Sequence, residues 1–470
     1  MKRSWADWFN QTPTTIRHLL DIITQIADGL CGYPLFVVLI GGGLLLFIHS
    51  RAVSLRRLPH ALRLLRENNS SSGDSGPISS IQALAAVVAA TIGMGNIAGV
   101  AIALALGGPG AVFWMWVSAI IGMSTKYHEG VLAIKYRHHA SDGSPRGGTM
   151  WIIDHALGRR WHSLALLFAV AGMFGTLCIM NANQLTEAVI SVTGRPDTVA
   201  VRAVIGTAIA ATVGVVVLGG IRRIARVATM LVPAMVAAYF MMVAWIILSH
   251  LSGVGAVAAS IIGGAFSLEA GWGALVGIAL IGARRAMLVN DAGVGTASLM
   301  HSQSANTEPV REGLMAMLGP AIDSGFVCTL TAFAILLCVD PADFEGVQGL
   351  NIAMAAFRQA LPWGDVMLLG VTACFALSSM FSYSFYGSSC ARYLGGDRGA
   401  RAYTYFFIAT LVVFAIIPAA AAVGLCDLFY ALMAFPTMFT ILRLRKEVAR
   451  ETQRYFNNEK SLEYGPRTTS

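Results

Sequence analysis

Apolar residues occur along the chain in long runs separated by short polar stretches. About twenty consecutive apolar residues suffice to cross the hydrocarbon core of a bilayer as a helix. The first run is short at its apolar core and gains length from Ile22 to Leu30. The pattern predicts an all-α polytopic membrane protein with about 11 transmembrane helices, near residues 34–49, 80–106, 111–135, 162–190, 199–219, 226–250, 255–283, 312–339, 364–390, 402–423 and 425–444.

Composition supports a membrane protein and excludes several other classes. The chain has 470 residues, of which 56% are hydrophobic and 12% are charged, so a soluble domain would lack the polar residues to cover its surface. A net charge of +8 would indicate nucleic acid only if the basic residues formed one concentrated patch. They lie in loops between spans, so we expect no nucleic-acid partner. The seven cysteines are widely spaced in mostly apolar runs, which is typical of buried apolar residues rather than of disulfides or a metal site.

Lys and Arg predict the orientation. With the N-terminus outside, 26 of the 33 basic residues fall in the inner loops and the C-terminal tail, and such a bias sets topology. We therefore expect a multi-pass protein of the cell membrane, a bacterial inner membrane, with its C-terminus in the cytoplasm. The stretch from Arg51 to Arg66 alternates leucines with arginines. It is either an amphipathic helix on the inner leaflet or an ordinary basic loop helix.

The second apolar run carries an unusual polar interruption. Gly93 and Gly95 lie two residues apart near its middle, and Asn96 follows directly. Glycine favours unwinding of a helix, and unwound backbone is tolerated in a membrane only where it lines a cavity or meets a partner. The interruption therefore indicates the floor of a binding site. The alternative is a helix contact packed through glycines, with Asn96 bonded to a neighbouring span.

Several motifs in this order resemble those of the alanine-or-glycine:cation symporter family, and the resemblance extends from about residue 34 to residue 444. The motifs are Gly93-Met94-Gly95-Asn96-Ile97-Ala98-Gly99-Val100-Ala101, Gly107-Gly108-Pro109-Gly110-Ala111, Phe113-Trp114-Met115-Trp116, Gly122-Met123-Ser124-Thr125-Lys126-Tyr127-His128-Glu129, Gly147-Gly148-Thr149-Met150, Asn181-Ala182-Asn183-Gln184, Asn290-Asp291-Ala292-Gly293 and Ile322-Asp323-Ser324.

The resemblance implies the leucine-transporter-type fold, a 5+5 inverted repeat preceded by one extra helix. The repeats would be residues 80–250 and 255–444, each beginning with a broken helix, and in the second we expect the break among Gly263, Gly264, Gly271, Gly273, Gly277 and Gly282. Residues 1–33 would be an extracytoplasmic segment, 34–79 the extra span with a basic linker, and 445–470 a cytoplasmic tail.

Candidate ligands follow from the broken helix. The N–H groups after the break, at Met94 and Gly95, suit a substrate carboxylate, because a helix N-terminus presents free donors and a positive dipole end. The carbonyls before the break suit a cation. The resemblance implies that a hydroxyl pair in span 9 completes a sodium shell, although such hydroxyls also bond back to their own helix. The predicted sodium ligands are Ala89, Ile92, Phe375, Ser378 and Ser379.

Further polar residues are expected to contact the substrate. Gln184 and Asn181 match the family's polar pair and would reach its ammonium or carboxylate. Departures from the family pattern, above all Met94 and Tyr383 in place of a hydroxyl residue and a tryptophan, affect the expected pocket. The predicted substrate site consists of Thr91, Gly93, Met94, Gly95, Asn96, Asn181, Gln184, Ser379 and Tyr383.

Ionisable residues inside spans are functional candidates because they are expensive to bury in a membrane. Asp323 is either a proton or cation relay or a buried acid bonded to hydroxyls such as those of Ser324 and Thr329. Lys126 and Glu129, three residues apart, are expected to form a structural ion pair that supports the inner gate.

The sequence thus favours a symporter that imports alanine, glycine or possibly serine together with Na⁺. The alternatives are a proton-coupled transporter of the same fold and a passive channel, which would need a continuous polar pore lining. An enzyme would need a nucleophile and base or a metal set, and none is recognisable. We expect no cofactor beyond the coupling ion, Na⁺ or H⁺. The expected partners are a small amino acid and the lipid bilayer, and no obligate protein partner is evident.

Overall fold

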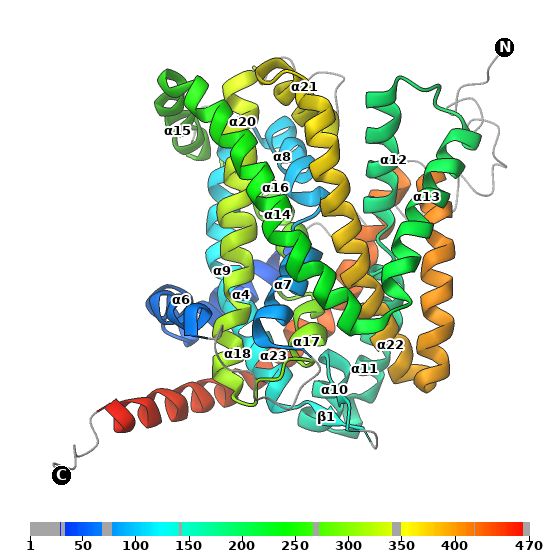
Figure 1. Cartoon of the computed structure of the whole chain (residues 1–470). Coiled ribbons are helices and arrows are strands. Elements are labelled where there is room, and N and C mark those ends of the chain that lie inside the picture. The colour runs from blue at the N-terminus through cyan, green and yellow to red at the C-terminus, as the bar shows by residue number, and fades with distance from the viewer. Residues whose placement is uncertain are drawn as a thin grey trace, which may run out of the picture.

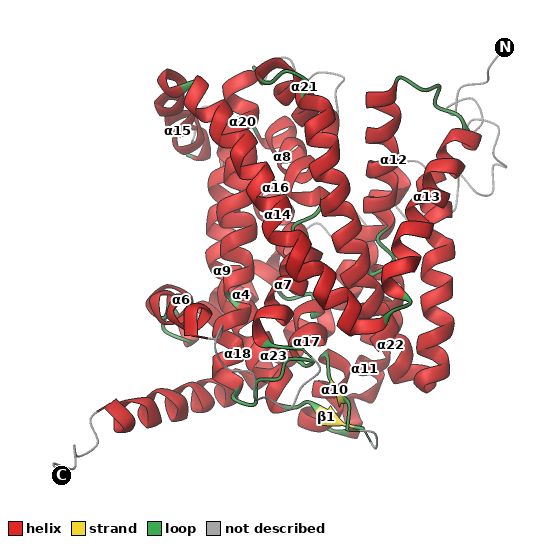
Figure 2. Ribbon diagram, viewed as in Figure 1, coloured by secondary structure: helices red, strands yellow, loops and turns green. Residues whose placement is uncertain are grey.

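The computed structural model describes residues 29, 33–67, 78–140, 143–266, 272–340, 349–417 and 419–463. These residues form a helical bundle with one antiparallel two-stranded sheet at one end (Figures 1 and 2). Helices dominate because backbone groups in a bilayer must be hydrogen-bonded within their own segment. Of the predicted segment 1–33, all but Gly29 and Tyr33 lies outside the described residues, as do residues 22–28 and 30 of the proposed extension of the first span.

The first half of the chain contains a short helical run at the start, a bent helix and several long helices. Its elements are α3 (Tyr33–Phe36), η1 (Val37–Gly41), α4 (Gly42–His49), α5 (Val53–Arg56), α6 (Leu58–Glu67), α7 (Ser80–Thr91), η2 (Gly95–Gly99), α8 (Val100–Gly107), α9 (Gly110–Lys135), β1 (His138–His139), β2 (Pro145–Arg146), α10 (Thr149–Ile152), η3 (Ile153–Leu157), η4 (Arg159–Trp161), α11 (His162–Gly175), α12 (Ile179–Thr193), α13 (Val199–Val217) and α14 (Gly220–Ser249).

The second half is similarly helical and ends in two very long helices. Its elements are α15 (Leu251–Ala265), α16 (Trp272–Asn290), α17 (Thr296–His301), α18 (Pro309–Ala316), α19 (Leu318–Pro320), η5 (Ala321–Val327), α20 (Cys328–Cys338), α21 (Leu350–Ala360), α22 (Gly364–Ile416) and α23 (Ala419–Glu463).

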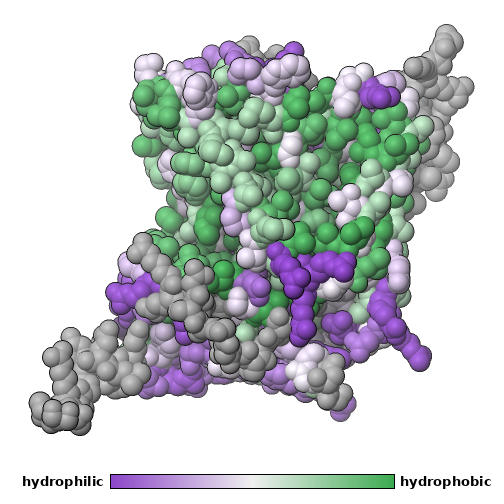
Figure 3. Space-filling model, in the orientation of Figure 1, coloured by the Kyte–Doolittle hydropathy of each residue, from purple (hydrophilic) through white to green (hydrophobic). Residues whose placement is uncertain are grey.

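Among the described residues, six helical stretches are long and apolar enough to cross a membrane, and a bent pair adds one more. On the visible face of the molecule, a hydrophobic band lies between two hydrophilic ends (Figure 3). The chain is therefore a multi-pass membrane protein. The six stretches are Arg159–Thr193, Val199–Val217, Gly220–Ser249, Pro309–Cys338, Gly364–Ile416 and Ala422–Asn458, and the bent pair is Ile81–Thr91 with Gly95–Gly107.

The predicted span 255–283 is wrong as a single helix. The structure has two helices here, α15 and α16, and the α16 helix continues to Asn290. Five of the six glycines predicted to mark the break lie within these two helices, and packing explains two of them, Gly264 and Gly282. A Cβ on Gly110 would lie 2.3 Å from the backbone of Gly264, and one on Gly282 would lie 2.3 Å from the carbonyl oxygen of Ala111. These glycines thus allow α15 and α16 to pack closely on α9.

Of those six glycines, Gly271 lies outside the described residues. The other three, Gly263, Gly273 and Gly277, have open space where a Cβ would lie. None of the described five breaks a helix at the centre of the bundle.

The last two predicted spans differ from the structure at their ends. The α22 helix contains both span 364–390 and most of span 402–423, and non-helical backbone at Gly395 and Gly396 separates its two arms. It ends at Ile416, and α23 begins at Ala419. The predicted tail 445–470 is helical as far as Glu463, because α23 continues without interruption beyond the membrane-length segment.

Candidate functional site

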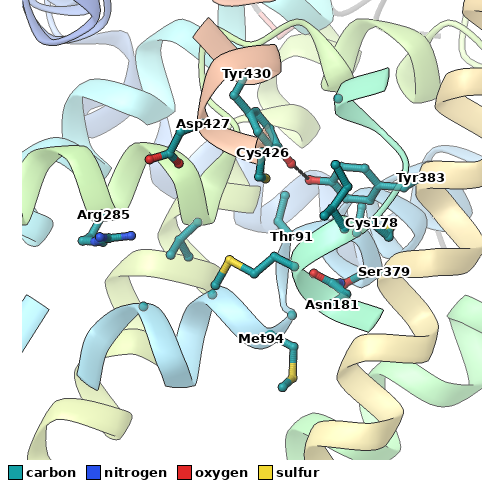
Figure 4. Close-up of a pocket in the computed structure, with 18 residues that line it drawn as sticks. Thr91, Met94, Cys178, Asn181, Arg285, Ser379, Tyr383, Cys426, Asp427 and Tyr430 are labelled. Carbon is teal, nitrogen blue, oxygen red and sulfur yellow. Dashed lines mark hydrogen bonds between the residues drawn. The ribbon is translucent and has the colours of Figure 1, made fainter. Parts of the chain in front are cut away.

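A cavity lies at the centre of the bundle, where the bent helix meets α12, α16, α22 and α23 (Figure 4). Helices α7 and α8, on either side of the bend, make an angle of 53°. Residues from all these elements line the cavity: Ala90, Thr91, Gly93, Met94, Gly95, Gly99, Gly175, Cys178, Ile179, Met180, Asn181, Arg285, Val289, Ser379, Tyr383, Cys426, Asp427 and Tyr430.

The bend occurs where the sequence predicts it. The α7 helix ends at Thr91, and helical structure resumes at Gly95. A Cβ on Gly93 would lie 2.7 Å from Ser379 Oγ, so only glycine allows α22 to approach this closely. The N–H groups of Met94 and Gly95 begin the new helical segment and therefore have no acceptor within it. They are available to an anion in the cavity.

Asn96 has a different role from the predicted one. It does not line the cavity; instead its Oδ1 accepts a hydrogen bond of 3.0 Å from Gly93 N–H, and its Nδ2 donates to Asp323 Oδ1. The side chain is fully buried, and a buried amide satisfies its donors and acceptor where it can. Asn96 therefore stabilises the unwound backbone from the side that faces away from the cavity.

The hydrogen bond from Asn96 also shows the surroundings of Asp323. Its carboxylate, carried by η5, is fully buried against the bent helix, and its partner is Asn96 rather than the hydroxyls of Ser324 or Thr329. Ser324 accepts from Asn290, and Thr329 donates to the carbonyl of Gly325. The second carboxylate oxygen of Asp323, Oδ2, has no hydrogen-bond partner among the described residues.

Four of the five predicted sodium ligands lie together. Ser378 Oγ and Ser379 Oγ each lie 3.2 Å from the carbonyl oxygen of Ala89, and 2.9 and 3.0 Å from that of Phe375. The hydroxyls thus bond back to their own helix, as the alternative predicts, and also cross to α7; the sodium-ligand role stays a prediction. The cluster joins α7 and α22 with four oxygens, and Ile92, the fifth predicted ligand, directly follows the last residue of α7.

The predicted substrate residues divide into two groups. Seven of the nine line the cavity: Thr91, Gly93, Met94, Gly95, Asn181, Ser379 and Tyr383. In Figure 4 the Met94 side chain points away from Tyr383 and Tyr430. Besides Asn96, the exception is Gln184, which is not among the lining residues and whose Oε1 lies near Gly349, before α21. Gln184 lies three residues after Asn181 on α12, and its side chain is directed towards Gly349 instead of the cavity.

A second helix break, between α16 and α17, contacts the cavity-lining residue Tyr383 through Asp291. Gly293 and Gly295 have φ of +86° and +95°, and Asp291 has φ of +52°. The hydroxyl of Tyr383 donates to Asp291 Oδ2 and lies 2.6 Å from that of Tyr430. The hydroxyl of Tyr383, the tyrosine that stands in place of the family's tryptophan, is therefore satisfied by Asp291.

Sequence reasoning missed this second break, although a signal was present. The Gly93-x-Gly95 spacing of the first break recurs as Gly293-x-Gly295. It follows the apolar run instead of lying inside it, because Asn290 and Asp291 end that run.

Two arginines next to the cavity were also misplaced. The predicted span 255–283 ends just before Arg284 and Arg285 and so leaves both outside the membrane helix, but both lie in α16. Arg285 lines the cavity, and Arg284 Nη2 lies 2.6 Å from Oδ2 of Asp427, another lining residue. Adjacent charged residues at the end of an apolar run suggested a loop, whereas the bundle interior provides a carboxylate that compensates one of them.

The predicted ion pair between Lys126 and Glu129 is not formed. Glu129 Oε1 instead accepts a hydrogen bond of 2.7 Å from Gly293 N–H at the second break. Lys126 Nζ is fully buried and has no hydrogen-bond partner among the described residues. Gly293 N–H lies in the unwound segment before α17 and needs a partner because it is buried, and Glu129 on α9 supplies the acceptor.

Comparison with known proteins identifies relatives along nearly the whole chain. The model of the sodium:alanine symporter family matches residues 16–468. An uncharacterized transporter of Haemophilus influenzae is 35% identical over 455 residues, covering 94% of this chain and 97% of that protein. The sodium/alanine symporter AgcS of Methanococcus maripaludis is 33% identical over 448 residues, covering 93% and 97%.

A solved structure shares the architecture. The crystal structure of MhsT in complex with L-phenylalanine superposes with a TM-score of 0.57 at 15% identity, covering 80% of this chain and 89% of that chain. MhsT has the leucine-transporter-type fold. At this identity the likeness concerns the fold alone.

Proposed function

Because this chain belongs to the sodium:alanine symporter family, we propose that it is a secondary active transporter that imports a small neutral amino acid, alanine, glycine or serine, together with Na⁺. The proposal includes the finer architecture: about eleven spans in two inverted five-helix repeats after one extra helix. It also includes an N-terminus outside and a C-terminus inside a bacterial inner membrane.

The observation that carries this proposal is the four-oxygen cluster between α7 and α22. Hard cations prefer neutral and anionic oxygen ligands, and here each of two hydroxyls lies within 3.2 Å of each of two carbonyl oxygens. In the absence of a cation the hydroxyl protons bond the two carbonyls. A bound Na⁺ would take over these oxygens, with the Ile92 carbonyl as a fifth ligand, and hold the two helices together.

Ser379 links the ion to the substrate. It belongs to the oxygen cluster and also lines the cavity, directly against Gly93. In the proposed mechanism, Na⁺ on Ser379 orders the unwound backbone, so that the N–H groups of Met94 and Gly95 meet the substrate carboxylate in the correct geometry. Each ligand then raises the affinity of the other by the same factor, as linkage requires. This reciprocity couples amino-acid uptake to the sodium gradient.

The test removes the two hydroxyls together. Uptake of labelled alanine into proteoliposomes, with and without an imposed sodium gradient, should require the gradient. In Ser378→Ala/Ser379→Ala, the half-saturating sodium concentration should rise at least about tenfold, because each lost contact to a charged ligand costs roughly 1.5–3 kcal/mol. Unchanged sodium dependence would remove the cluster from the coupling mechanism.

A matched control lies on the same helix. Ser384 and Ser388 are buried in α22 and donate only to carbonyls of their own helix among the described residues, at 2.7 and 3.0 Å. The double variant Ser384→Ala/Ser388→Ala should therefore keep the native sodium dependence.

Proton coupling is the second candidate, and the unpartnered Oδ2 of Asp323 favours it. A buried carboxylate with one orphan oxygen can hold a proton there. In that case Asp323→Asn would abolish the dependence of uptake on a proton gradient, and removal of sodium would leave uptake unchanged.

A further inference from the structure

We propose a binding site for the phosphate group of an anionic phospholipid beside the first helical run, in a place separate from the transport cavity. A pocket lies between the residues that follow α4 and the C-terminal part of α23. We call it the basic pocket; its polar lining includes His49, Arg51, Arg56, Arg57, Gln453 and Asn457. The inference uses the proposed membrane orientation and does not depend on which amino acid is transported.

The charge of the basic pocket selects an anion. Three arginines line it, and none of its lining residues is acidic. The nearby carboxylates of α23 are occupied elsewhere, since Lys135 Nζ lies 3.2 Å from Glu447 and 3.1 Å from Glu451. Within the described part of the chain, no ion pair forms on Arg51, Arg56 or Arg57. Guanidinium groups match the geometry of phosphate oxygens through paired N–H donors, so a phosphate is the expected ligand.

The basic pocket is also held in shape. The guanidinium of Arg57 lies over the ring of Phe456, 3.6 Å from its centroid, which fixes this side chain against α23. Arg51 and Ala52 both have φ of +54°, an uncommon conformation for residues with a Cβ. Arg56 Nη1 donates to the carbonyl of Arg51 at 3.4 Å. The tight turn between α4 and α5 thus brings two arginines to one side of the pocket.

The surroundings place the basic pocket at the membrane surface. Leu55 beside it and Leu62 in α6 are each 49% exposed, although arginines alternate with them. In Figure 1, α6 and the end of α23 project from the same side of the bundle, and His60 of α6 packs edge-on against Tyr455 and Phe456 of α23. Exposed leucines beside basic residues are typical of a helix lying at the lipid headgroups. Of the two sequence interpretations of this stretch, the structure favours the interfacial helix.

These observations distinguish a lipid phosphate from a soluble one. A soluble anion needs only the arginines, whereas a lipid also needs apolar surface beside them for its acyl chains. Leu55 and Leu62 supply that surface. On the proposed topology the basic pocket faces the cytoplasmic leaflet, where basic residues are attracted to anionic headgroups.

Native mass spectrometry of the purified full-length protein tests the site by titration with phosphatidylglycerol and with phosphatidylcholine. Each basic residue contributes about fivefold to binding an anionic surface, so Arg51→Gln/Arg56→Gln/Arg57→Gln should weaken phosphatidylglycerol binding on the order of 100-fold. Phosphatidylcholine binding should not change. The control Arg222→Gln/Arg223→Gln/Arg226→Gln removes three charges from the first two turns of α14 and should bind phosphatidylglycerol as the native protein does.

Inorganic phosphate separates the two sources of ligand. We expect phosphate added to the complex to leave phosphatidylglycerol bound. Displacement of the lipid by phosphate, with equal thermal stabilisation of lipid-free protein, would overturn the lipid assignment in favour of a soluble anion. Equal lipid retention by the native protein and the triple variant would overturn the site itself. Circular dichroism of the variant confirms that a loss of binding does not come from unfolding.

Discussion

The break between α7 and η2 lines the cavity, and the break between α16 and α17 contacts one of its lining residues, Tyr383, yet the two breaks are stabilised by different kinds of side chain. At the first break the contacts to the unwound backbone come from uncharged side chains: Asn96 caps Gly93 N–H, and Ser378 and Ser379 donate to the Ala89 carbonyl. At the second break a carboxylate, Glu129, accepts from the backbone at Gly293.

The difference indicates that the two breaks have different roles. Hydroxyls can turn away from carbonyls and offer their oxygens to a cation, so the first break can exchange its internal partners for ligands. Glu129, which also comes from another helix, is an acceptor and has no hydroxyl proton that could turn away. Asp291 at the same break accepts from Tyr383 and, at 3.3 Å, from Thr296. We infer that the second break keeps its internal hydrogen-bond partners, whereas the first can exchange them for ligands. We call the second break a fixed wall and the first a responsive one.

The largest expected effect comes from removing the carboxylate at the second break. Glu129→Leu leaves Gly293 N–H unpaired and removes the negative charge nearest in sequence to the buried Lys126, so it should destabilise the protein by about 3 kcal/mol or more, because a buried donor loses a charged acceptor. Thermal unfolding in detergent and the amount inserted in membranes measure this loss. Glu129→Gln keeps an acceptor and should lose much less. Equal stability of the native protein and Glu129→Leu would contradict the view of the second break as a fixed wall.

A smaller effect is expected at the first break. Asn96→Ala removes the cap of Gly93 and the partner of Asp323, and we expect a loss of about 1–3 kcal/mol. A double-mutant cycle with Asp323→Ala isolates the contact between the two side chains. The combined loss should be smaller than the sum of the single losses. Strict additivity would mean that Asn96 acts on the backbone alone.

The smallest effect separates two polar residues on α12. Asn181 lines the cavity, so Asn181→Leu should weaken alanine binding about tenfold, equivalent to about 1.4 kcal/mol. Gln184 lies outside the lining, and Gln184→Leu should change alanine affinity less than about twofold. Isothermal titration with alanine in saturating sodium measures both. A larger loss from Gln184→Leu than from Asn181→Leu would show that the cavity is remodelled when substrate binds.

The sequence by itself determined the membrane class, the position of most helices and the first break. These features follow from local rules: a bilayer demands long apolar runs with internally bonded backbone, and paired glycines inside such a run mark where it unwinds. The hydroxyl pair of Ser378 and Ser379 could likewise be identified in sequence, because their place on one helix face and the family motif both point to a cation site.

Tertiary structure alone decided which distant groups meet. Glu129 and Gly293 are 164 positions apart, and Asn96 and Asp323 are 227 apart; nothing in the local pattern of either pair specifies the other. The nearest opposite charge to Glu129 in sequence, Lys126, is not its partner, because the unwound segment of a packed neighbour offers the backbone donor Gly293 N–H at 2.7 Å. Arg284 and Arg285 looked like loop residues for the same reason: only the folded bundle brings Asp427 beside them and makes charged residues tolerable inside the membrane.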